Sequence, residues 1–185
     1  SAEVAKKIYL EEHPNTNIHV INSLSAGGEV DLIVRKLNQL VAEGLDFDQV
    51  VDVITTYQSK TKLLFVLAKV DNLVKNGRLS KLIGTVVGLL NIRMVGEASK
   101  TGTLELLQKA RGQKKAIKAA FDELIKAGYN GGHITIAHRN NEKFIEQFSE
   151  LVREKFARAM IEVLPTSGLC SFYAEEGGLL MGYEI

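Results

Sequence analysis

The chain has 185 residues, of which 45% are hydrophobic and 24% are charged, proportions that are ordinary for a globular domain with one continuous core. A net charge of +1, few aromatic residues and no tryptophan argue against a nucleic-acid partner, which requires a basic stripe and stacking side chains. Cys170 is the single cysteine, which excludes an internal disulfide and fits a cytoplasmic location, and no apolar run is long enough for stable membrane insertion.

Hydrophobic periodicity predicts a mixture of helices and strands along the chain. In chain order, the pattern predicts a helix at 2–12, a strand at 18–21, a helix from the loop at 22–28 to about residue 43, a helix over 46–54, a strand at 63–67, a short helix at 70–75, a helix at 79–90, strands at 91–97 and 103–109, a helix at 112–127, a strand at 133–137, a helix at 141–152, and strands at 159–164 and 178–185. A turn at 100–102 joins two of the strands in a hairpin. The fold class expected is therefore α/β, a two-layer domain with a mixed β-sheet of about six strands covered by helices.

The loop at 22–28 stands between a predicted strand and a predicted helix. Hydroxyl groups on Ser23 and Ser25, together with free N–H groups at the start of the helix, are able to bind an anion. A capped helix that follows a tight turn, with no ligand, explains the same residues. The loop has neither of the glycine-rich phosphate-binding patterns, so a phosphate-binding enzyme is weakly supported.

The helix predicted at 79–90 is apolar on almost every side. Gly84 and Gly88 share one face because they lie four residues apart. Each interior glycine costs about 1 kcal/mol of helix stability relative to alanine, so a compensating role is expected. Close packing of the helix against the sheet and a shallow apolar groove for another chain both remain open.

Charged residues suggest no catalytic centre. The four histidines lack the spacing of metal ligands, and neighbouring carboxylates such as Glu175 and Glu176 rarely face one reacting atom. Arg78, Arg93 and Arg111 lie next to apolar segments, and Arg93 is inside an apolar run, where a buried guanidinium would need an anionic partner. We therefore expect a protein that is not an enzyme and that has no metal or cofactor.

Five segments resemble motifs of the DegV family of fatty-acid-binding proteins, in the same order and at compatible spacing. They are VINS at 20–23 (family V-x-D-S), GRLSK at 77–81 (GRIS), LNIR at 90–93 (LNIKP), RGQKKA at 111–116 (R-[GT]-x-KKA) and YAEEGGLLMGY at 173–183 (H-x-G-P-G-x-x-G). The resemblance runs from about Val4 to the end of the chain. It implies a two-domain protein that holds one long-chain fatty acid, such as palmitate, between its domains and presents the carboxylate to a fatty acid kinase.

By this resemblance, residues 1–185 form a single domain, the C-terminal DegV domain. The preceding N-terminal domain, of roughly ninety residues, is expected to be absent from this chain. The start at Ser1, without an initiator methionine, also suggests a fragment. The chain is therefore expected to supply only part of the lipid cleft.

The same resemblance implies a set of lipid-binding residues. We expect them to be Ser23, Ser25, Gly27, Ile83, Val87, Arg93 and Tyr173. Ser23 is expected to donate to the carboxylate, and Arg93, at the family's lysine position, to supply positive charge nearby. Tyr173 takes the place of the family's histidine, and the adjacent Glu175 and Glu176 are expected to repel an anionic head group.

Two other functions fit parts of the sequence. One is a phosphotransferase-like enzyme related to the dihydroxyacetone-kinase fold, for which the chain offers no general base, metal set or phosphate loop. The other is a protein-interaction domain that binds no lipid. Loss of lipid binding in a full-length Ser23→Ala variant would favour the carrier over the interaction domain.

Overall fold

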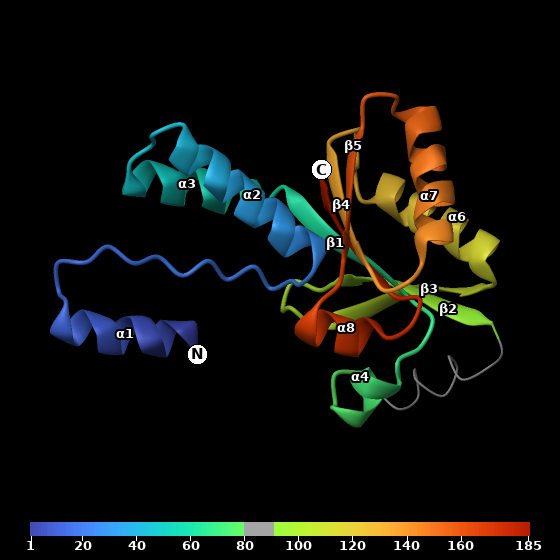
Figure 1. Ribbon diagram of the computed structural model, residues 1–185, viewed down its shortest axis with the longest axis horizontal. Coiled ribbons are helices and arrows are strands. Elements are labelled where there is room, and N and C mark those ends of the chain that lie inside the picture. Colours follow the sequence, from blue (N-terminus) through green and yellow to red (C-terminus); the bar gives the residue numbers. More distant parts are fainter. Residues whose placement is uncertain (80–90) are drawn as a thin grey trace.

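The computed structural model describes residues 1–79 and 91–185. Within these ranges it contains a six-stranded sheet with the strand order β3-β2-β1-β6-β4-β5, flanked by helices (Figure 1). Ile83, Val87 and nearly all of the helix predicted at 79–90 lie outside the described residues. No described helix is long and apolar enough to cross a membrane.

The helices and strands follow the order that the sequence pattern predicts, with a few exceptions given below. The helices are α1 (Ala2–Glu12), α2 (Gly28–Ala42), α3 (Phe47–Gln58), α4 (Asp71–Lys75), α6 (Gln113–Lys126), α7 (Glu142–Lys155) and α8 (Gly168–Ala174). The strands are β1 (Thr61–Leu67), β2 (Ile92–Ala98), β3 (Leu104–Arg111), β4 (His133–His138), β5 (Met160–Pro165) and β6 (Leu179–Glu184).

The sheet is mixed, which confirms the predicted fold class. Only β4 and β5 pair in parallel, while β1 pairs antiparallel with both β2 and β6, and β2 and β3 form the predicted hairpin. The α7 helix connects the two parallel strands, as a parallel pair requires a crossover. A register shift at Val95 and Gly96 bends the hairpin next to the centre of the sheet.

One face of the sheet is fully covered. The α6 and α7 helices lie over it and pack their apolar sides against it (Figure 1). Phe144 and Phe148 of α7 are completely buried there together with Tyr183 of β6. This layer forms the main hydrophobic core and explains the alternation along β6, whose odd-numbered residues face these helices.

The opposite face is covered only in part. Leu63, Phe65 and Leu67 of β1 point to this side with Leu180 of β6, and α4 and α8 pack over one end of the face. The start of α2 packs closely on β4 and β6, where a Cβ added at Gly28 would lie 2.1 Å from the carbonyl oxygen of Thr135. The centre of this face is left as the floor of a cleft.

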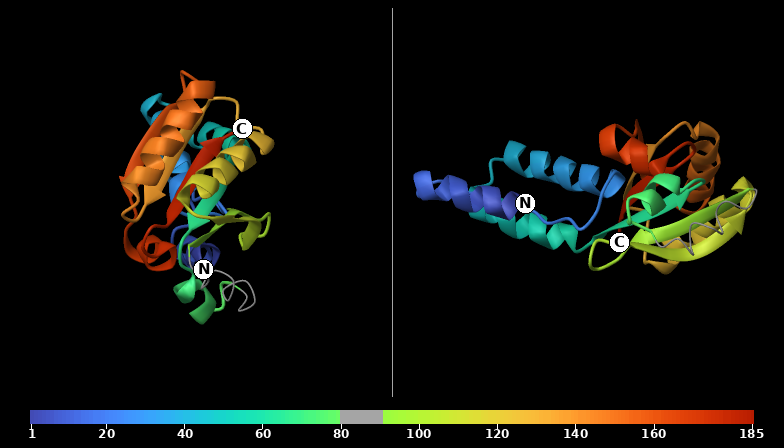
Figure 2. Two further views of the ribbon diagram at one scale, coloured as in Figure 1. Left: turned by 90° about the vertical axis from the view of Figure 1, so that its right-hand side faces the viewer. Right: turned by 90° about the horizontal axis from the view of Figure 1, so that it is seen from below.

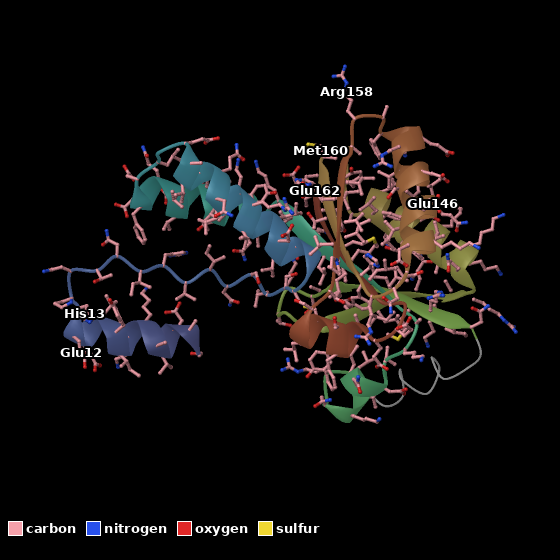
Figure 3. All side chains as sticks on the ribbon, in the orientation of Figure 1. Glu12, His13, Glu146, Arg158, Met160 and Glu162 are labelled. Carbon is pink, nitrogen blue, oxygen red and sulfur yellow. The ribbon has the colours of Figure 1, made fainter. Side chains whose placement is uncertain are left out.

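The N-terminal part of the chain extends away from the sheet as an arm. The α2 and α3 helices lie side by side and share a small core of Ile33, Leu40 and Ile54 (Figures 1 and 2). Asp46 forms a capping box with Gln49 at the start of α3. No residue of α1 is buried, and Figure 3 shows its end, at Glu12 and His13, far from the sheet.

The local structure differs from the sequence-based expectations at 18–21 and at α8. The segment 18–21 is extended but is not a strand, because none of the described strands pairs with it. The α8 helix was not expected, since its seven residues are too few for a clear helical period. Asn141 stands at the cap position of α7 but does not cap it, because its side chain donates instead to the carbonyl oxygen of Gly177 at 2.7 Å.

Candidate functional site

A cleft of about 530 Å³ lies on the partly covered face of the sheet. This volume falls within the range of about 300–1,000 Å³ that is typical of small-molecule sites. Its floor is formed by Leu63, Phe65 and Leu67 of β1 and by Leu180 of β6. The floor is therefore purely aliphatic and aromatic, which suits an apolar ligand.

The loop at 22–26 forms one side of the cleft, and the β2–β3 turn closes against it. All five residues of the loop line the cleft, as do Thr101, Gly102 and Thr103 of the turn. A Cβ added at Gly102, whose φ is +74°, would lie 3.3 Å from Leu24, so the two segments are in close contact. The resulting rim is rich in hydroxyl groups.

The loop itself is held in an unusual conformation. Leu24 has a φ of +51°, in the left-handed region that a leucine rarely adopts. The backbone N–H of Ser25 donates to Oγ of Ser23 at 3.3 Å, which stabilises the turn. The Oγ of Ser25 is buried and has no hydrogen-bond partner among the described residues. A buried hydroxyl without a partner is costly, and strained backbone concentrates at functional sites, so both features favour a ligand here.

Arg78 is the one cation among the described residues that line the cleft, and these residues include no carboxylate. It follows α4 after Gly77, and its backbone N–H donates to the carbonyl oxygen of Leu73 at 2.8 Å. Gly77 has a φ of +67°, so the turn that places Arg78 depends on a glycine. The sequence pattern singled out Arg78 only as one of three isolated arginines.

The α8 helix forms the opposite side of the cleft. Leu169, Cys170, Tyr173 and Ala174 line it, and Cys170 is a free, partly exposed thiol. Tyr173 thus lines the same space as Ser23 and Arg78.

The two carboxylates that follow α8 are hydrogen-bonded to groups outside the cleft lining, and their expected repulsion of an anionic head group stays a prediction. Glu175 accepts a hydrogen bond from the backbone N–H of Asn72 at 2.9 Å. Glu176 accepts one from Nδ2 of Asn140 at 3.2 Å and lies 3.7 Å from Nε of Arg139. Neither carboxylate is among the residues that line the cleft.

The structure places Arg93 apart from the cleft. Side chains alternate along β2, and Met94, which pairs with Leu67, faces the cleft side of the sheet, so Arg93 faces the other side. Its Nε and Nη1 are buried without a hydrogen-bond partner among the described residues, and burial lowers its pKa. A Cβ added at Gly177 would lie 3.6 Å from Nη1, which locates the guanidinium next to the loop between α8 and β6.

Gly27 ends the loop but does not line the cleft. Its φ is +56°, and an added Cβ would lie 2.7 Å from Cβ of Leu180, so the glycine allows α2 to approach the sheet. Of the seven residues expected to bind lipid, the structure therefore brings Ser23, Ser25 and Tyr173 together in the cleft. Arg78, Cys170 and the apolar floor were not among those expected.

Comparisons with known proteins identify the family of the chain. The family model described as "Uncharacterised protein, DegV family" matches residues 1–183. A DegV domain-containing protein of Streptococcus gordonii is 77% identical over 185 residues, which are 100% of this chain and 66% of that protein. The chain thus spans 66% of the length of this relative.

Two solved structures are similar over the whole chain. The fatty acid kinase (Fak) B3 protein of Streptococcus pneumoniae, loaded with linoleic acid, is 76% identical with a TM-score of 0.97, and the match covers 100% of this chain and 66% of that one. A DegV family protein of Eubacterium eligens, loaded with heptadecanoic acid, is 37% identical with a TM-score of 0.95, and the match covers 100% of this chain and 67% of that one.

Proposed function

The chain belongs to the DegV family, and we propose that in the full-length protein it supplies one wall of a cleft that binds a long-chain fatty acid. The observation that carries this proposal is the composition of the cleft: an apolar floor, a rim of hydroxyls and a single arginine among the described lining residues. This combination complements a molecule that is apolar along its length and anionic at one end. The acids bound by the two similar structures have this chemistry.

The apolar floor supplies the affinity for the acyl chain. Each methylene group removed from water contributes about 0.8 kcal/mol, so a long chain needs no specific polar contact along its length. Leu63, Phe65 and Leu180 are positioned to contact it. The sheet holds all three rigidly because they are part of paired strands.

The carboxylate is the expensive end of the ligand to remove from water, and it requires donors. Ser23, Ser25, Arg78 and Tyr173 offer hydroxyl and guanidinium donors from three separate segments around the same cleft. Arg78 takes the charge-pairing role that the family resemblance implied for Arg93. The buried Oγ of Ser25 then gains the partner that it lacks among the described residues.

The part of the relatives that this chain does not match, about a third of their length, would supply the second wall of the cleft. The exposed apolar residues of the arm, which include Val4 and Ile8 of α1 and Phe47 of α3, have no partner among the described residues and suit contact with that second wall. We infer that residues 1–185 form the C-terminal domain and that the acid is held between two domains.

The protein is then a carrier and not an enzyme. The carboxylate end of the bound acid would be presented to a fatty acid kinase, a partner that the name of the similar pneumococcal protein suggests. The described residues that line the cleft offer neither an evident general base nor a set of metal ligands, which suits a site that binds without reacting. A cytoplasmic location follows from a kinase partner that uses a nucleotide.

Native mass spectrometry of the full-length protein, purified from cells without added lipid, tests the proposal. A bound mass that matches a long-chain fatty acid is expected, and an Arg78→Gln variant should carry less of it. A folded full-length protein without any bound acid, which also fails to take up palmitate in vitro, would refute the carrier function.

A further inference from the structure

We propose that Glu175 is a positioning residue, which holds Arg78 at the cleft by capping the helix that precedes it. The proposal rests on the proposed function, because it assigns Arg78 to the ligand carboxylate. Glu175 does not line the cleft, so its effect on binding would pass through α4. Comparison with the family's closing motif predicted the opposite effect for this carboxylate, repulsion of the ligand.

The contact between Glu175 and α4 is well defined. Helix α4 begins at Asp71, and its N-cap residue, Val70, has no side chain that is able to cap it. The backbone N–H of Asn72 in the first turn instead donates to Oε1 of Glu175, 103 residues later in the chain. A carboxylate at this position satisfies a free helix N–H and interacts favourably with the helix dipole.

A second hydrogen bond joins the same two segments. Nδ2 of Asn72 donates to the carbonyl oxygen of Phe172 in α8 at 2.8 Å. Asn72 therefore connects α4 with α8 by both its backbone and its side chain, and Figure 1 shows the two short helices next to each other at the end of the sheet. Glu175 has a φ of +52° at the end of α8, in the left-handed region that a glutamate rarely adopts.

These contacts link the two sides of the cleft that would meet the head group. Helix α4 leads directly to Gly77 and Arg78, while α8 carries Tyr173. Because α4 has only five residues, few internal hydrogen bonds hold it, and its position depends on what caps it. Loss of the Glu175 contact should therefore shift Arg78 relative to Tyr173 without emptying the apolar floor.

The neighbouring carboxylate provides a matched control. Glu176 contacts Asn140 and Arg139 and makes no hydrogen bond to α4 among the described residues. It differs from Glu175 by one position and has the same charge. A general effect of removing negative charge near the cleft would therefore appear equally in Glu176→Ala and Glu175→Ala.

The test is a set of dissociation constants, measured on the full-length protein, for palmitate and for its uncharged methyl ester. We expect Glu175→Ala to weaken palmitate binding about fivefold, since one charge-assisted contact is displaced, and to change ester binding less than twofold. Glu175→Gln keeps an acceptor oxygen and should restore most of the affinity, while Glu176→Ala should match the wild type. Faster hydrogen exchange at the Asn72 amide in Glu175→Ala would report the lost cap directly.

Combining the substitution with Arg78→Gln separates this inference from the function itself. If Glu175 acts through Arg78, then Glu175→Ala should have no further effect in the Arg78→Gln background. Additive losses, or an equal loss of acid and ester binding, would overturn the positioning role. Wild-type protein that binds neither compound would instead refute the proposed function, so the two failures are distinguishable. Should Glu175→Ala fail to fold, Glu175→Asp, too short to reach Asn72, is measured in its place.

Discussion

Phe65 of β1 pairs with Gly96 of β2, and its ring fills the space that a side chain on Gly96 would need, because a Cβ added there would lie 2.3 Å from Cζ of Phe65. Phe65 is also part of the cleft floor. Because Gly96 has no side chain, the Phe65 ring has room beside it, and the place of this ring sets the depth of the cleft. The register shift between Val95 and Gly96 occurs at the same point.

Phe65 should limit the acyl chains that the cleft accepts. Phe65→Leu replaces the phenyl ring with a smaller aliphatic side chain, which should deepen the floor above Gly96 and shift the order of affinities toward longer saturated acids. The cost in folding stability is expected to be about 1–2 kcal/mol, because a smaller apolar side chain remains. Competition binding with a series of acids of increasing length measures the shift. An unchanged order of affinities would mean that the acyl chain does not reach Phe65.

Ser25 should affect ligand affinity and stability in opposite directions. Its Oγ is buried without a partner among the described residues, so Ser25→Ala should leave the free energy of unfolding of the ligand-free protein unchanged or raise it by up to about 1 kcal/mol. Palmitate affinity should fall about tenfold, as expected for a lost hydrogen bond to a carboxylate.

Ser23→Ala is the comparison for this prediction. The Oγ of Ser23 accepts the N–H of Ser25, so its removal should lower stability as well as affinity. Urea unfolding and isothermal titration calorimetry give the two quantities for each variant. A Ser25→Ala protein that is destabilised, yet binds palmitate normally, would show that the hydroxyl has a structural role.

Gly27 should be required for stability and not for contact with the ligand. Gly27→Ala places a Cβ 2.7 Å from Cβ of Leu180 and imposes a φ of +56° on a residue with a side chain. We expect a loss of about 2–3 kcal/mol in the free energy of unfolding. Gly44→Ala is the control, since Gly44 also has a positive φ, of +79°, but its added Cβ has no atom within 4 Å.

The control should lose only about 1 kcal/mol, the cost of the backbone conformation alone. Chemical denaturation of both variants under the same conditions measures the difference. Equal losses at the two positions would indicate that the packing of α2 against Leu180 relaxes easily.

Tyr129 should make the folded state less stable at high pH. Burial, reinforced by the charge of Glu184, raises the pKa of Tyr129 from 10.0 to about 12. Between these two pH values the phenol ionises in the unfolded chain but stays neutral in the folded one, so the stabilisation present below pH 10 is lost as the pH rises toward 12.

Tyr129→Phe should reduce this decline, although it also removes the hydrogen bond from the phenol to the carbonyl oxygen of Gly132 at every pH. Tyr9→Phe is the control because Tyr9 is 49% exposed on α1. The measurement is the slope of unfolding free energy against pH between 10 and 12. A slope that is the same in Tyr129→Phe and in wild type would contradict the assignment.

The fold could be predicted largely because its long elements have strong patterns. The α6 and α7 helices each bury one apolar side, and β1 is apolar from Leu63 to Leu67, where it is central to the sheet. The extended segment at 18–21 has the composition of a strand, but pairing depends on a partner that is distant in the chain. Helix α8 has seven residues, and its position follows from contacts with α4 that no local pattern encodes.

The site was predictable only where it is local in sequence. The loop at 22–28 combines small residues with hydroxyls before a helix, and Ser23 and Ser25 followed from that pattern. The choice between Arg78 and Arg93 depended on which face of the sheet carries the Arg93 side chain. The register of β2 against β1 decides this. The engagement of Glu175 by Asn72 spans 103 residues, so no spacing rule anticipates it.

The alkylation rate of Cys170 tests the central claim most directly. Cys170 is the only cysteine in these 185 residues, it is partly exposed, and it lines the cleft together with Tyr173 and Leu180. In the full-length protein, saturating palmitate should slow maleimide modification of the peptide that contains Cys170 by about tenfold or more, because a bound acyl chain covers the thiol. A rate that is unchanged while palmitate is shown to be bound would place the fatty acid elsewhere and contradict the assignment of this cleft.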